Sequence, residues 1–151
     1  MHFDSGVQMD PAVLSLIRIS AKRAYPNECC GFLWGDGTSI LFAAEVDNVS
    51  AGDRKNHFQI NSSAYIAAET FAESHGLTLL GIFHSHPDSP AIPSTEDTKM
   101  ALPNFFYIII PLKGNMVQEE RCWVLDGSGK FKELHLNITI PQSPQTSIWQ
   151  Q

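Results

Sequence analysis

Residues 78–97 read TLLGIFHSHPDSPAIPSTED, and this stretch decides how the chain folds around them. It opens with an apolar run, which predicts a strand over residues 78–84. Because a proline has no N–H to give to a strand ladder, Pro87 ends the pairing and begins a loop. Ser94 then caps a short helix, with Asp97 three residues on in the position of a capping-box partner.

Two histidines stand at the end of this strand. His84 and His86 are one residue apart, and because side chains alternate across a strand, both imidazoles point to the same side. Neutral imidazole binds zinc, and a third protein ligand leaves the fourth tetrahedral position to water. The loop returns the chain so that Asp97 can supply that third ligand. Two neutral imidazoles and one carboxylate leave a net positive charge on the zinc, and such a site can lower the pKa of its bound water from 15.7 to about 7.

Hydrophobic period and turn residues predict the elements on both sides of this stretch. Asp10 caps a helix that Pro26 stops. Asn61 or Ser62 caps a second helix, whose body is residues 64–75. The first two and the last two predicted strands form hairpins, and the apolar run before the last hairpin is a buried central strand. The predicted strands are residues 29–34, 39–46, 57–60, 105–110, 121–126 and 131–137.

Length and composition indicate one ordinary domain. The chain has 151 residues and is 43% hydrophobic, enough to bury a core without the help of a metal or disulfides. We expect residues 1–140 to form this domain. Residues 141–151 are polar and contain prolines, so we expect a flexible C-terminal tail there.

Charge and hydropathy exclude several kinds of partner. The formal net charge is -6, with 16 acidic against 10 basic residues, which lacks the basic surface of a nucleic-acid binder. The N-terminal residues have no basic start followed by an apolar stretch, so no secretory signal is predicted. The longest apolar run, residues 105–112, is too short to span a bilayer. We expect a cytoplasmic protein without membrane or nucleic-acid partners.

The cysteines and the remaining histidines have ordinary explanations. Cys29, Cys30 and Cys122 are odd in number and two are adjacent, which favours reduced thiols. A nucleophilic or ligand role for Cys29 and Cys30 stays open, but an apolar strand more often uses cysteine as a small core residue. The other histidines are expected to be surface or core residues: His2, His57, His75 and His135.

The segment His84-Ser85-His86-Pro87, followed at the right distance by Ser94-Thr95-Glu96-Asp97, resembles the signature of the JAMM (MPN-plus) metalloproteases. Residues 26–33, PNECCGFL, look like the family's glutamate-bearing strand. The resemblance in element order extends over about residues 7–137. It implies an α/β fold in which a mixed, curved β-sheet carries helices on both faces, a three-layer architecture like that of cytidine deaminases.

The resemblance also assigns roles to individual residues. It implies one Zn²⁺ per chain with a bound water, held by His84, His86 and Asp97. It makes Glu28 the general base, which takes a proton from the water and hands it to the leaving amine. Ser94 is expected to donate a hydrogen bond to the tetrahedral oxyanion. Its role as a helix cap is an equal alternative on sequence grounds.

The family resemblance implies a zinc-dependent metallopeptidase or isopeptidase. Its members hydrolyse amide bonds, often after the glycine tail of a ubiquitin-like protein, and the short chain favours a prokaryotic stand-alone member that acts on sulfur-carrier proteins. A non-catalytic MPN scaffold that binds protein partners is the alternative, and it predicts missing ligands. A zinc deaminase needs a His-x-Glu and a Pro-Cys-x-x-Cys, and neither occurs here. The oligomeric state stays open.

Overall fold

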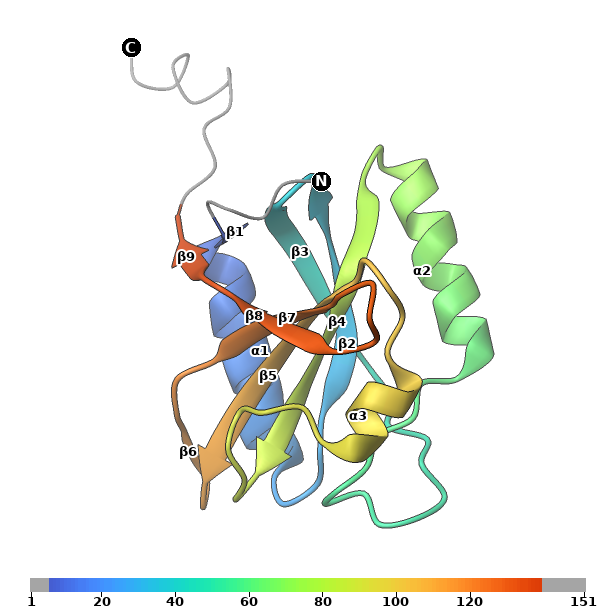
Figure 1. The fold of residues 1–151 in the computed structure, drawn as a ribbon. Helices are drawn as coiled ribbons and strands as arrows, with labels where there is room; N and C mark the ends of the chain where they lie inside the picture. The colour runs from blue at the N-terminus through green and yellow to red at the C-terminus, as the bar shows by residue number, and fades with distance from the viewer. Residues whose placement is uncertain (1–5, 140–151) are drawn as a thin grey trace.

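The computed structural model describes residues 6–139, which form three helices and nine strands (Figure 1). The helices are α1 (Pro11–Ala24), α2 (Ser62–Ser74) and α3 (Thr95–Met100). The strands are β1 (Val7–Met9), β2 (Cys30–Asp36), β3 (Ser39–Val46), β4 (Thr78–Pro87), β5 (Phe106–Lys113), β6 (Met116–Val117), β7 (Arg121–Leu125), β8 (Phe131–Leu134) and β9 (Leu136–Ile138). None of the helices in the described part of the chain has the length and apolar character to cross a membrane.

All of these strands belong to one mixed sheet, in the order β8-β7-β5-β4-β2-β3-β1-β9, with β6 added to β5. The central strand β4 pairs antiparallel with β2 and parallel with β5. It runs through Pro87, beyond the strand predicted over residues 78–84, because β5 continues beside it and pairs Leu112 with Pro87. His86, which the predicted strand left out, is therefore paired within the sheet, as His84 is.

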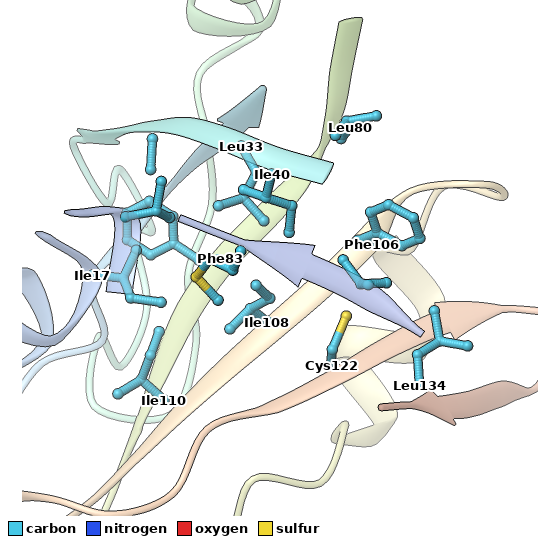
Figure 2. Packing of buried hydrophobic residues seen from close by; sticks show 14 of the residues in the cluster. Ile17, Leu33, Ile40, Leu80, Phe83, Phe106, Ile108, Ile110, Cys122 and Leu134 are labelled. Atoms are coloured by element: carbon cyan, nitrogen blue, oxygen red, sulfur yellow. The ribbon is translucent and has the colours of Figure 1, made fainter. Parts of the chain in front are cut away.

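Helices cover both faces of the sheet, which confirms the predicted three-layer α/β fold (Figure 1). Ile17 of α1 packs with Phe83 and Ile108 in one buried cluster, part of which is shown in Figure 2. Ala68 of α2 packs with Ile82 in a second cluster. Because Ile82 and Phe83 are neighbours in β4, their alternation sends one side chain to each layer.

The helices begin where the sequence predicts. The Asp10 carboxylate accepts a hydrogen bond from the Ala12 N–H at 2.8 Å, and the Asn61 side chain accepts one from the Ser63 N–H at 3.0 Å. These contacts satisfy N–H groups that have no partner inside the helix.

The sheet curls until its two ends come together. β8 and β9 stand at opposite ends of the strand order, yet only His135 separates them in the chain. Since consecutive Cα atoms are about 3.8 Å apart, both ends of the sheet must meet at His135. Its carbonyl accepts a hydrogen bond from the Val7 N–H at 2.8 Å. This confirms the predicted curvature and splits the strand predicted over residues 131–137 into two.

The prediction of a strand over residues 57–60 is wrong. Those residues form no strand, because their backbone groups pair within the preceding loop rather than with a neighbouring strand. The Gln59 carbonyl accepts from the Val49 N–H at 2.9 Å, and the Gln59 N–H donates to the Asn48 side chain at 3.2 Å. The predicted tail, residues 141–151, lies outside the described residues.

Gly81 provides a test of how closely β4 and β5 approach. A Cβ atom at Gly81 would lie well inside contact distance of the Phe106 carbonyl oxygen, and the obstacle is backbone that cannot rotate away. We expect Gly81→Ala to lower the free energy of unfolding by roughly 1–3 kcal/mol, as overpacking of a core does. The control is Gly127→Ala, where a Cβ meets nothing within 4 Å and the change should stay within about 0.5 kcal/mol. Equal urea midpoints for both variants would contradict the close approach.

Candidate metal centre

The two histidines of β4 lie side by side in the interior. Their side chains point to the same side of the sheet, as the one-residue spacing predicts, with ring centroids 5.0 Å apart. Both are buried, at 1% exposure for His84 and 7% for His86. Buried histidines normally find a polar partner, so the groups that face their ring nitrogens decide what they can do.

Asp97 approaches both imidazoles from the first turn of α3. Its Oδ2 lies 3.1 Å from His86 Nε2 and 3.8 Å from His84 Nε2. The same oxygen accepts a hydrogen bond from the Ser94 N–H at 2.8 Å, while the Ser94 hydroxyl oxygen accepts one from the Asp97 N–H at 3.0 Å. This is the predicted capping box, and it holds the carboxylate against the histidines.

Glu28 lies just before β2 and is brought to the site by the pairing of β2 with β4. Cys30 lies opposite His84 in that register. Glu28 is only 4% exposed, and its Oε1 lies 3.4 Å from His84 Nδ1. Ligand atoms of Glu28, His84 and His86 all lie within 4.8 Å of one another. The structure thus brings all five predicted site residues into one region.

The tautomer of His86 follows from its contact with the loop. Its Nδ1 lies 2.8 Å from the Pro90 carbonyl oxygen. A carbonyl oxygen can only accept, so Nδ1 carries the proton, and neutral His86 turns the lone pair of Nε2 toward Asp97. Two acceptors then face each other at 3.1 Å. Such a contact is stable only if a proton or a metal cation lies between them.

Glu28 Oε1 and His84 Nδ1 are buried and face each other at 3.4 Å, and neither makes a hydrogen bond among the described residues. Leaving such groups without a hydrogen bond is costly. Bond lengths of 2.0–2.1 Å in a tetrahedral zinc site place ligand atoms about 3.3 Å apart. The Asp97 distances of 3.1 and 3.8 Å to the two histidines bracket that spacing. The residues therefore fit a bound metal.

The electrostatics of the site favour a cation between Asp97 and His86. Burial lowers the pKa of His86, but its hydrogen bonds to Asp97 and Pro90 outweigh this and raise that pKa above its usual value. Burial alone would raise the pKa of Asp97, but the hydrogen bond from His86 and the charge of His84 lower it overall. A metal must displace the proton that this pair shares, so metal binding weakens as the pH falls.

A cleft of about 360 Å³ opens beside these residues. Glu28, His86 and Ser94 all line it, so a molecule in the cleft can reach these three side chains. Lys55 and His57 line it as well, and the sequence had indicated only an ordinary histidine at position 57. The contact of the Pro90 carbonyl with His86 was also missed, because no local sequence pattern marks a backbone group that acts on a neighbouring side chain.

The cysteines take no part in this site. All three are free and buried. Burial raises the pKa of the Cys29 thiol, and it raises the pKa of Cys30 and of Cys122 to about 12. The thiols are therefore protonated at neutral pH, which favours the predicted role as small core residues over a nucleophile.

The three-layer fold and the cluster of two buried imidazoles, one buried carboxylate and one half-buried carboxylate define the class, a JAMM-type metallopeptidase domain. The chain belongs to the family described as prokaryotic homologs of the JAB domain, whose model matches residues 10–126. This confirms the family that the sequence resembles.

Relatives agree with this assignment. The chain is 32% identical over 130 residues to the desampylase of Haloferax volcanii, covering 84% of this chain and 89% of that protein. It is 43% identical over 102 residues, 68% of each protein, to the probable TtuB-protein conjugate cleaving protease of Thermus thermophilus. The crystal structure of a JAB1/MPN domain protein from Archaeoglobus fulgidus superimposes with a TM-score of 0.59 at 20% identity, covering 90% of this chain and 99% of that one. That likeness shows the fold.

The buried thiols yield a direct test. We expect Cys29, Cys30 and Cys122 in the folded protein to react with a thiol reagent at pH 7.5 more than about 100-fold slower than in denaturant, because burial withholds the thiolate. The measurement is the absorbance change with an aromatic disulfide, with and without guanidinium. Rapid labelling of one thiol in the native protein would return a chemical role to that cysteine.

Proposed function

We propose that this chain is a zinc-dependent isopeptidase that hydrolyses the amide bond after the C-terminal glycine tail of a ubiquitin-like or sulfur-carrier protein. The observation that carries the proposal is the contact of one Asp97 oxygen with both histidines, 3.1 and 3.8 Å from their Nε2 atoms, beside a buried glutamate. The non-catalytic scaffold predicts missing donors, and every donor is present among these residues.

In this proposal His84, His86 and Asp97 hold one zinc ion per chain. Zinc in such a site supplies a Lewis acid that polarises the scissile carbonyl and acidifies water. Glu28 could instead be counted as a ligand, because its carboxylate also lies near both histidines. We favour Asp97, because its carboxylate contacts both Nε2 atoms and is fixed by the capping box.

Glu28 then acts as the general base. Its side chain is buried but lines the cleft, with Oε1 facing His84 Nδ1 at 3.4 Å, so a water beside the histidines could give its proton to this carboxylate. The same carboxyl group delivers that proton to the leaving amine. A positioned acid–base group of this kind typically contributes 10²–10⁴-fold in rate.

Ser94 serves two purposes in this proposal. Its hydroxyl oxygen accepts from the Asp97 N–H, which uses one lone pair and leaves the O–H free to donate. Because Ser94 lines the cleft, that O–H can stabilise the oxyanion of the tetrahedral intermediate. The cap and the catalytic contact therefore do not exclude one another.

The shape of the cleft and the names of the relatives support the substrate class. The cleft is lined by Lys55 and His57 of one loop and by residues of the segment from Pro90 to Glu96. An extended glycine tail carries no side chains and fits such a space. The relative from Thermus thermophilus is named for cleaving protein conjugates. Three unpaired cysteines accord with a reducing compartment, and we propose a cytoplasmic location.

Glu28→Gln separates the base from the ligands. We expect the variant to bind one zinc per chain like the wild type and to hydrolyse a Gly-Gly–lysine isopeptide conjugate about 10²–10⁴-fold more slowly, because the amide cannot accept a proton. Metal content is measured by elemental analysis and cleavage by mass spectrometry. His86→Ala is the control that should lose the zinc. Loss of zinc from Glu28→Gln would make Glu28 a ligand, and full activity would remove it from the mechanism.

Ser94→Gly separates the cap from the oxyanion contact. Glycine is nearly as good a helix cap as serine, and the backbone N–H that holds Asp97 is kept, so folding and zinc binding should change little. The variant has no O–H, so kcat should fall about 10²–10³-fold. The measurements are a thermal melt and steady-state kinetics on the same conjugate. An unchanged kcat would leave Ser94 with its capping role alone.

A further inference from the structure

The two histidines of the centre differ in how their rings are held. A metal-binding imidazole is usually oriented by a hydrogen bond from its other ring nitrogen. His86 has such a bond, from Nδ1 to the Pro90 carbonyl oxygen at 2.8 Å. His84 Nδ1 has no hydrogen-bond partner in the described part of the chain. The one polar contact of His84 Nδ1 given for these residues is Glu28 Oε1 at 3.4 Å, which is not a hydrogen bond, so packing against the ring matters more for His84 than for His86.

Phe58 lies flat against that ring. The Phe58 and His84 centroids are 4.5 Å apart and their planes differ by 25°, which is a stacked arrangement. Stacking on one face opposes rotation of the imidazole about its Cβ–Cγ bond. Phe58 itself is half-buried, and it packs against the cluster of buried residues beneath α2. It is therefore backed by the core rather than free in solvent.

Phe58 belongs to a segment without helix or strand, and Asn48 holds that segment in place. The Asn48 amide donates to the His57 carbonyl at 3.0 Å, and its oxygen accepts from the Gln59 N–H at 3.2 Å. Both sequence neighbours of Phe58 are thus bonded to one side chain. The remaining donor reaches the Glu28 carbonyl at 3.1 Å, and the remaining lone pair accepts from the Ser50 N–H at 3.1 Å. All four hydrogen-bonding sites of Asn48 are used.

The same loop also holds the other backbone group of Glu28, whose N–H donates to the Arg54 carbonyl at 2.7 Å. Glu28 and His84, whose Oε1 and Nδ1 atoms face each other at 3.4 Å without a hydrogen bond, are therefore both held by one loop. We propose that Asn48 and Phe58 are positioning residues, with Phe58 orienting the His84 imidazole for metal and Asn48 fixing Phe58 and the backbone of Glu28 together. This inference rests on the proposed function, since it concerns the same centre.

The first test changes Phe58 and measures zinc affinity by competition with a chromogenic chelator. Phe58→Leu keeps an apolar side chain but removes the flat ring, and we expect zinc to bind about 10-fold or more weakly. Phe58→Tyr keeps the ring and should bind zinc like the wild type. Equal affinity in all three proteins would overturn the role of Phe58. A wild-type protein that binds no zinc would overturn the proposed function, and this inference with it.

The second test changes Asn48, and its matched control changes Asn61, whose side chain also accepts a hydrogen bond from a backbone N–H. Asn48→Ala should weaken zinc binding and lower kcat on the Gly-Gly–lysine conjugate about 10-fold or more, with KM changed less than about threefold. Asn61→Ala removes the N-cap contact of α2 and leaves the hydrogen bonds of Asn48 in place, so it should lower the melting temperature while leaving zinc affinity and kcat unchanged. Parallel losses in both variants would show a general stability effect and overturn the role of Asn48. Should Asn48→Ala fail to fold, the Phe58 pair still decides the proposal.

Discussion

The pairing of β2 with β4 is the constraint on which the rest of the site depends. It sets Cys30 opposite His84, so the residue two places before Cys30 arrives beside the histidines. Because side chains alternate, a slip of one residue in either strand would turn its side chains to the other face of the sheet. Apolar layers on both faces hold the register, with Phe83 packed in one cluster and Ile82 in the other. The chemistry of the centre is thus fixed by the packing of residues that have no chemical role.

At the start of α3, the same hydrogen bonds serve two purposes. The hydrogen bonds between Ser94 and Asp97 satisfy N–H groups that every helix leaves unpaired at its first turn. The same bonds aim the Asp97 carboxylate at the histidines, 3.1 Å from His86. A helix cap and a ligand arm are therefore one structure. The loop that leads to it contributes as well, since the Pro90 carbonyl sets the tautomer of His86.

The centre is polar and leaves some buried groups without hydrogen bonds, whereas the two clusters around it are apolar. Acceptors face each other across the site, and Glu28 and His84 keep buried atoms without hydrogen bonds. A cation bound between Asp97 and the Nε2 atoms of the histidines would relieve the first condition. The two apolar clusters lie on opposite faces of the sheet and contain none of the five site residues. Stability and metal binding are consequently separable, which is why the variants of the site can be examined in a folded protein.

The features that the sequence alone determined are those formed by residues close together in the chain. The capping contacts of Asp10, Asn61 and Ser94, and the shared face of His84 and His86, each involve neighbours within a few positions, so local geometry suffices. The role of Glu28 as general base could be expected only through family resemblance. Only the tertiary structure decided that the sheet closes on itself at His135 and that residues 57–60 form part of a loop instead of a strand. The physical reason is that these features depend on which distant backbone groups become hydrogen-bond partners, and no local pattern of residues specifies that choice.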